Sequence, residues 1–159
     1  MLTKDYSFQS ERLCFKGIQK DDAELIVKWR SKPENYKNFL NTKPITLEDH
    51  LKWFAGYLEN PTRYDFMISE LDGTKIGTCG LSGIDEVSCE ISYMIGEESC
   101  RGKGYAKEAV QALSNVAFKE LGVEHIDARI LSHNVASMHV VMKSGFSEYE
   151  RVYRISKDA

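Results

Sequence analysis

The strongest chemical signal in the chain is a glycine-rich segment, Arg-Gly-Lys-Gly-Tyr-Ala, at residues 101–106. It stands between a strand-like run at residues 89–95 and a strongly helical run at residues 103–121. Two glycines at such a junction let the backbone approach a ligand and leave several N–H groups pointing outward. The helix that follows adds the positive end of its dipole, and Arg101 and Lys103 add two cations. We therefore expect this segment to bind a pyrophosphate.

Two common phosphate-binding patterns are absent. There is no Gly-x-x-x-x-Gly-Lys-Ser/Thr, and Gly-x-Gly-x-x-Gly fails because Lys107 stands where the third glycine is needed. The segment instead fits Arg/Gln-x-x-Gly-x-Gly/Ala through Arg101, Gly104 and Ala106. This pattern resembles the acyl-CoA pyrophosphate loop of the GCN5-related N-acetyltransferases.

The resemblance covers nearly the whole chain. Residues 134–146, which read Asn-Val-Ala-Ser-Met-His-Val-Val-Met-Lys-Ser-Gly-Phe, are similar to the family's helix beside the CoA pantetheine, closed by a glycine turn. The opening at residues 10–13 and 21–23 resembles the ribosomal-protein N-terminal branch. The resemblance implies acetyl-CoA as cosubstrate, direct transfer to a primary amine, and a particular set of CoA-binding residues. These are Met94, Ile95, Arg101, Gly102, Lys103, Gly104, Tyr105, Ala106, Asn134, Ser137 and Lys143.

Acetyl transfer to an amine needs a neutral amine, a stabilised oxyanion and a leaving thiolate. The resemblance implies Glu90 as general base, directly or through water, although a strand carboxylate in an ion pair is the competing interpretation. Backbone N–H groups near Met94 and Ile95, freed by a strand bulge, are expected to meet the oxyanion.

The thiolate partner is less clear from sequence. Many relatives carry a tyrosine two residues before the lysine of the Lys-x-Gly-Phe turn, but this chain has Val141 there. Ser137 is the favoured replacement, and Tyr93 and Tyr153 compete with it. Acid catalysis is also dispensable in principle, because a thiolate is a tolerable leaving group.

The acceptor is expected to bind through the N-terminal half. Residues 28–31 and 42–53 resemble the amino-sugar branch, which includes the pseudaminic-acid pathway enzymes that acetylate a UDP-linked 4-amino-4,6-dideoxy sugar. Tryptophans could stack on a base or sugar, and basic side chains could contact phosphate, although the tryptophans also have a spacing that suits core packing. The candidate acceptor-binding residues are Trp29, Arg30, Lys43, His50 and Trp53.

Two other functions remain open at this point. The opening at residues 10–13 favours an N-terminal acetyltransferase of a ribosomal or other protein. The valine at position 141 leaves room for a catalytically silent acyl-CoA-binding regulatory module.

The net charge and the cysteines of the chain limit the kinds of partner and cofactor that we expect. A net charge of −3 gives no reason to expect nucleic acid or an acidic membrane surface. The four cysteines form no CxxC pair, so we expect reduced thiols, no metal and, with no signal peptide in residues 1–10, a cytoplasmic location. A monomer and a homodimer both remain possible.

The pattern predicts one α/β domain over residues 1–159, with helices on both faces of a partly parallel sheet. Helices are expected from the Asp21-Asp22 cap to Arg30, from Thr46 onward, and over residues 103–121 and 134–143. Strands are expected at residues 12–17, 64–71, 75–81, 86–95, 125–131 and 146–155.

Overall fold

The computed structural model describes residues 1–157 as a six-stranded mixed sheet in the order β1-β2-β3-β4-β5-β6. Every neighbouring pair is antiparallel except β5 and β6, which are parallel. The strands are β1 (Ser7–Gln9), β2 (Leu13–Gly17), β3 (Tyr64–Glu70), β4 (Lys75–Ser82), β5 (Ser88–Ile95) and β6 (His125–Asp127). The helices are α1 (Ala23–Arg30), α2 (Pro33–Tyr36), α3 (Leu47–Glu59), α4 (Tyr105–Val116) and α5 (Val135–Lys143), with short turns η1 (Lys20–Asp22), η2 (Glu98–Cys100) and η3 (Ala117–Leu121).

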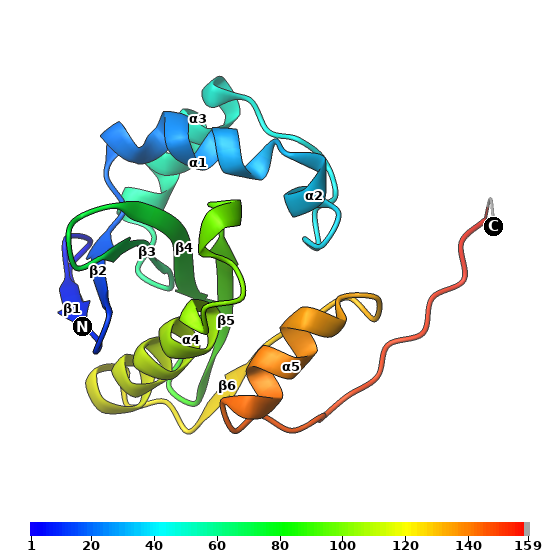
Figure 1. Cartoon of the computed structure of the whole chain (residues 1–159). Coiled ribbons are helices and arrows are strands. Elements are labelled where there is room, and N and C mark those ends of the chain that lie inside the picture. Colours follow the sequence, from blue (N-terminus) through cyan, green and yellow to red (C-terminus); the bar gives the residue numbers. More distant parts are fainter. Residues whose placement is uncertain (158–159) are drawn as a thin grey trace.

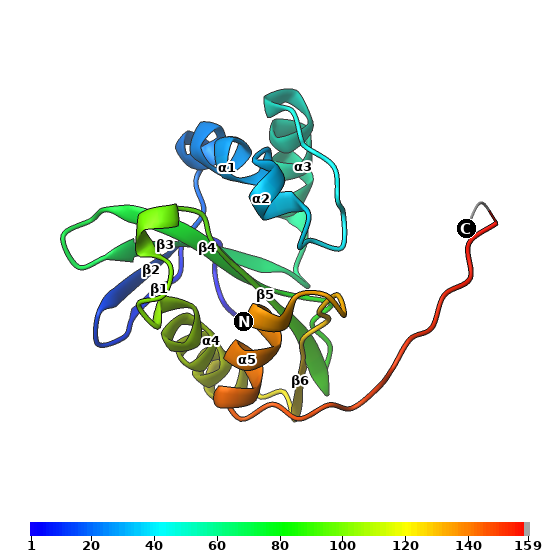
Figure 2. The same ribbon diagram turned by 45° about the vertical axis from the view of Figure 1, so that its right-hand side comes forward.

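The helices cover both faces of the sheet, as predicted. Helices α1, α2 and α3 lie on one side, and α4 and α5 lie on the other (Figure 1; Figure 2). The larger core packs α4 against the sheet through fully buried side chains such as Phe15, Leu81 and Leu113. A smaller core under α1 and α3 is centred on Trp29 and Met67. The fold class predicted from the sequence is therefore confirmed.

Local signals located several elements correctly. Thr46 caps α3, because its Oγ1 accepts a hydrogen bond from the Asp49 N–H at 3.1 Å. Asn134 caps α5 in the same way, with its Oδ1 accepting from the Ser137 N–H at 3.2 Å. The β3–β4 hairpin turns through Gly73, whose φ of 91° requires glycine.

Other boundaries were wrong. The strand predicted at residues 125–131 ends at Asp127, because β6 pairs with β5 through only three residue pairs. The helix predicted over residues 103–121 begins at Tyr105, and its last turn, η3, is a π-helix. The short elements β1 and α2 had no sequence prediction.

The strand predicted at residues 146–155 is also wrong. This segment has no strand assignment and runs away from the body of the molecule (Figure 1). Its large side chains are exposed, with Tyr149 at 94% and Ile155 at 96%. Aromatic and β-branched residues favour an extended backbone, but a strand also needs a neighbouring strand to pair with.

Candidate active site

The glycine-rich segment forms a left-handed turn at the start of α4. Gly102 and Gly104 have φ values of 74° and 80°, and the helix begins at the next residue, Tyr105. Arg12 braces this turn from the start of β2, because its Nη1 donates to the Lys103 carbonyl at 2.9 Å and its Nε to Glu108 Oε2 at 2.6 Å. The backbone N–H groups of the turn and of the first turn of α4 are thus arranged to bind an anion.

The Arg101 side chain, expected at the phosphate, is engaged within the protein. Its Nε and Nη2 each lie 3.3 Å from the Ile95 carbonyl, and Nη2 also donates to Asn35 Oδ1. Asn35 is buried and donates in turn to the Trp29 carbonyl at 2.8 Å. Arg101 therefore ties the turn to β5 and α2. Lys103 remains exposed beside the turn as a cation for phosphate.

The expected catalytic residues lie on opposite faces of β5. Met94 packs against the smaller core under α1 and α3, and Tyr93 packs against the core under α4. Because side chains alternate along a strand, Glu90 shares the α1/α3 face with Met94. The acceptor-side base and the thiolate partner would therefore work from the two sides of one strand.

The backbone of β5 offers a donor at its end. The pairing of β4 with β5 runs from Gly77↔Ile95 to Ser82↔Glu90 with no register shift, so the expected bulge is not seen in these residues. Gly96 donates to the Ile76 carbonyl at 2.8 Å, and by alternation the Met94 N–H points toward β4 and the Ile95 N–H toward the open side. Since β6 leaves β5 after Glu90↔Asp127, Ile95 is the better oxyanion donor of the two.

Glu90 is held by an arginine beyond β6. Arg129 Nε lies 2.7 Å from Glu90 Oε2 and Nη2 lies 3.3 Å from Oε1, while 28% of the Glu90 side chain remains exposed. The carboxylate raises the pKa of Arg129, first through its hydrogen bond and then through its charge. The competing interpretation of Glu90 as an ion-pair partner is thus seen in the structure, and its role as base stays a prediction.

Two of the residues considered for the thiolate contact each other. The Tyr93 hydroxyl donates to Ser137 Oγ at 2.9 Å and lies 3.3 Å from the Ser137 carbonyl. Val141, one turn further along α5, is buried. Tyr153 is 85% exposed in the C-terminal segment, away from this pair, so its predicted role is not supported.

A cavity of about 300 Å³ lies between α1, α3 and the sheet. Arg30, His50 and Trp53, three of the predicted acceptor residues, line it together with Arg63 and Asp65. Arg30 Nε and His50 Nε2 are buried atoms with no hydrogen-bond partner. Burial lowers the pKa of both side chains, and the Arg30 charge lowers that of His50 further. The cavity therefore offers two unsatisfied polar groups to a ligand.

Comparison with known proteins identifies the chemistry. Residues 12–147 match the family described as "Acetyltransferase (GNAT) domain". The chain belongs to the GNAT acetyltransferase family. It is 29% identical over 147 residues to an uncharacterized N-acetyltransferase, p20, of Bacillus licheniformis, covering 87% of this chain and 81% of that protein.

Two further relatives have named activities. The acetyltransferase PseH of Campylobacter jejuni is 24% identical over 136 residues, covering 86% of this chain and 83% of PseH. The crystal structure of spermidine N-acetyltransferase from Vibrio cholerae, in complex with CoA and spermine, superposes with a TM-score of 0.83 at 16% identity, covering 89% of this chain and 84% of that one. This chain is thus an acetyl-CoA-dependent N-acetyltransferase.

The glycine turn suits the CoA that a GNAT acetyltransferase uses. Gly102 has open space where a Cβ would stand, so a ligand can approach its backbone. CoA supplies the activated acetyl thioester, and the turn, Lys103 and the α4 N-terminus are the groups that would hold its pyrophosphate. Asn134 stands at the start of α5 with its amide oxygen used by the helix cap, which leaves its NH₂ group for the pantetheine. Tyr105 would contact CoA only through its backbone, since its hydroxyl donates to Glu70 Oε2 at 2.9 Å.

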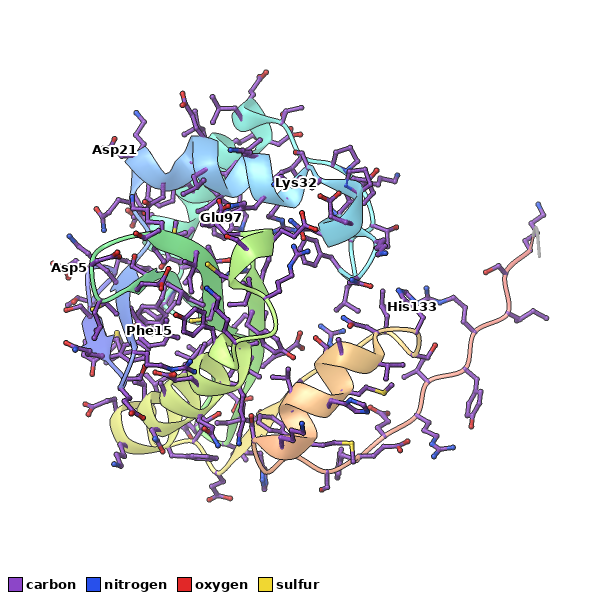
Figure 3. The ribbon with its side chains drawn as sticks, viewed as in Figure 1. Asp5, Phe15, Asp21, Lys32, Glu97 and His133 are labelled. Carbon is purple, nitrogen blue, oxygen red and sulfur yellow. The ribbon has the colours of Figure 1, made fainter. Side chains whose placement is uncertain are left out.

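Trp29 does not bind the acceptor of this acetyltransferase, contrary to the sequence prediction. Its side chain is fully buried, and its Nε1 donates to Glu97 Oε1 at 2.8 Å. Glu97 lies directly under α1 (Figure 3). The Trp29 ring occupies the space beside Gly96, where a Cβ would stand 2.2 Å from it. Trp29 therefore fixes the end of β5, which makes it a structural residue of the site.

Two residues of the cavity were missed by sequence reasoning. Arg63 and Asp65 form a close pair, with Arg63 Nε 2.6 Å from Asp65 Oδ2. The Asp65 carboxylate lies over Gly80, where a Cβ would meet Oδ1 at 2.5 Å. The only signal in the sequence was two opposite charges at strand spacing, one just before β3 and one within it, which is common on exposed strands. By contrast, Lys43 is exposed and does not line the cavity.

The remaining observations concern the surface and other ligands. Lys143 is exposed at the C-terminal end of α5, so its contact with CoA stays a prediction. Across residues 1–157, no three His, Cys, Asp or Glu side chains gather in a way that could hold a metal ion. Over the same residues, no helix has the length and apolar character needed to span a bilayer.

Proposed function

We propose that this acetyltransferase acetylates the 4-amino group of a UDP-linked amino sugar. The observation that carries the proposal is the buried, unpartnered Nε of Arg30 in the cavity between α1, α3 and the sheet. A guanidinium in this position has lost part of its hydration without gaining a carboxylate, so an anionic group on the ligand would satisfy it. A nucleotide sugar carries such an anion together with an amine.

The charged side chains that line the cavity are two arginines and two aspartates: Arg30, Arg63, Asp49 and Asp65. Arg63 lies close enough for its charge to lower the pKa of Arg30, and Asp65 accepts paired hydrogen bonds from Arg63. Arg30 forms no ion pair among the described residues, so an anionic group on the ligand would find its cation free to bind.

The amine would reach β5 from this cavity. Thr78 of β4 lines the cavity and pairs directly with Met94, so the cavity reaches the strand next to β5, which carries Glu90 and the Ile95 N–H. Trp53 lines the same cavity, with its ring stacked on Tyr57 at 5.2 Å between centroids and the Arg63 guanidinium 5.0 Å from its centroid. A sugar or base would have to pack at the Trp53 edge or displace Arg63 from the ring.

The alternative acceptor is the N-terminus of a ribosomal or other protein. A polypeptide needs an open groove, whereas the cavity is a compact pocket of about 300 Å³. We further propose a cytoplasmic location, since the four cysteines carry free thiols and acetyl-CoA must be at hand.

Thiol release from acetyl-CoA tests the proposal against four acceptors: a UDP-4-amino-4,6-dideoxy sugar, N-terminal peptides, polyamines and aminoglycosides. Turnover confined to the sugar nucleotide is expected. In that assay Arg30→Gln should raise the acceptor KM by roughly tenfold or more, because a charged hydrogen bond is lost. Lys52→Gln, an exposed change on α3, is the control.

Turnover on a peptide alone would move the enzyme to the protein-modifying branch. An unchanged KM in Arg30→Gln would show that the anion does not bind at Arg30.

A further inference from the structure

Tyr93 and Ser137, which the sequence analysis treated as competing candidates at the CoA sulfur, contact each other in the structure. The Tyr93 hydroxyl donates its hydrogen to Ser137 Oγ at 2.9 Å. We propose that Tyr93 is a positioning residue, which orients and polarises the Ser137 hydroxyl so that Ser137 donates a hydrogen bond to the departing thiolate.

The hydrogen bonds that Ser137 makes within the protein support its role as a donor to the thiolate. Its Oγ accepts from Tyr93, and in the described part of the chain no hydrogen bond has the Ser137 hydroxyl as its donor. Ser144, on the same helix, shows the usual alternative, because its hydroxyl donates back to the Val140 carbonyl at 2.7 Å. The Ser137 proton thus remains available to a ligand.

The Tyr93 phenol is well suited to stay a donor. Burial raises its pKa above the ordinary value of 10, so the proton is retained through the physiological range. A hydroxyl that accepts one hydrogen bond becomes a stronger donor for the next, because hydrogen bonds in a chain polarise one another. The half-buried site strengthens this effect.

The location of the pair fits the leaving group. The bond joins β5 to the first turn of α5, and β6 has parted from β5 after Glu90↔Asp127. Asn134, the cap of α5, stands three residues before Ser137. Ser137 and the Asn134 amide therefore lie at the start of α5, and the Ile95 N–H lies on the side of β5 that β6 has left.

The proposal leaves the chemistry balanced. The amine nitrogen forms the new C–N bond, and the C–S bond breaks with its electron pair remaining on sulfur. The proton lost by the amine passes to Glu90 or to solvent. The thiolate, hydrogen-bonded by Ser137, takes its own proton from water, so neither Tyr93 nor Ser137 is left deprotonated.

The test uses CoA itself and needs no acceptor. The thiol of bound CoA is titrated through the ultraviolet absorbance of its thiolate in wild type, Tyr93→Phe, Ser137→Ala and the double variant. Ser137→Ala is expected to raise the pKa of the bound thiol by roughly half to one unit, and Tyr93→Phe by about half of that. The double variant should match Ser137→Ala, because Tyr93 acts only through Ser137.

Desulfo-CoA supplies the control, since it lacks the sulfur. Its affinity is expected to stay within about twofold in all four proteins, as the remaining contacts are unchanged. Ser137→Thr, which keeps the hydroxyl, should titrate like wild type and serves if Ser137→Ala proves unstable. The proposal is overturned if Tyr93→Phe leaves the thiol titration unchanged, or shifts it equally with and without Ser137.

Discussion

Arg129 donates a hydrogen bond to each carboxylate oxygen of Glu90. Glu90 pairs with Asp127, and this is the last residue pair before β5 and β6 separate. This contact places an arginine between the proposed general base and the solvent. Only part of the arginine is buried, since 69% of its side chain is exposed, so the pair can open when an acceptor arrives.

Glu90→Gln and Arg129→Gln separate the two roles of this pair. Loss of a general base is expected to lower kcat by about 100-fold or more in Glu90→Gln. Arg129→Gln keeps the carboxylate and should cost less than about tenfold. Thiol-release kinetics measure both, with CoA affinity as the control. Equal losses in the two variants would assign Glu90 a structural role instead.

Gly104→Ala tests the phosphate turn. Any side chain at its φ of 80° is strained by roughly 1–2 kcal/mol, and the turn must shift to relieve the strain. CoA affinity, measured by calorimetry, is expected to fall at least about tenfold because the N–H groups lose their alignment. Gly122→Ala is the matched control, since its φ of 72° imposes a similar strain at the far end of the helix. A comparable loss of affinity in both variants would mean that strain alone is responsible.

His50 makes stability depend on pH. Burial, reinforced by the Arg30 charge, lowers the pKa of His50 in the folded protein below the ordinary 6.5. The unfolded chain therefore takes up a proton near pH 6.5 while the folded protein does not, so stability is complete above that pH and falls as the pH drops below it. His50→Gln should lose this part of the slope in denaturant titrations between about pH 7 and pH 5. His139→Gln, an exposed change on α5, should keep the wild-type slope, and a parallel slope in His50→Gln would contradict the assignment.

Gly96→Ala tests the packing at the end of β5. The new methyl group would stand 2.2 Å from the Trp29 ring, so the free energy of unfolding should fall by roughly 1–3 kcal/mol. Gly56→Ala in α3 has nothing within 4 Å and should instead raise it by about 0.5–1 kcal/mol. Chemical denaturation measures both. A Gly96→Ala protein as stable as wild type would mean that Trp29 is free to move.

Local sequence signals were sufficient where the interaction itself is local. The caps at Thr46 and Asn134 join residues three apart, and the turn at Gly73 depends on one backbone angle. The glycine-rich turn before α4 is a local feature too, because it depends on the spacing of two glycines and on the helix that follows them directly in the chain. For this reason the left-handed turn before α4 could be located from residues 101–106, and its binding of CoA stays a prediction.

Local sequence patterns did not predict the structure where contacts with residues far away in the chain determine it. Residues 146–155 are rich in aromatic and β-branched residues that favour strands, yet in the structure they pair with no strand and leave the body of the protein. Trp29 was expected at a ligand because tryptophan often stacks on one. In the structure its ring packs beside Gly96 and its Nε1 donates to Glu97, two residues far away in the chain, so Trp29 belongs to the core.

The sequence by itself determined the family, the CoA turn and the α/β class, since these depend on short patterns of residue type and spacing. Only the tertiary structure decided that Arg63 and Asp65 join Arg30 and His50 in one cavity, and that Tyr93 donates to Ser137. These contacts join residues far apart in the chain. Their distances and burial arise from packing across the sheet, which no local pattern records.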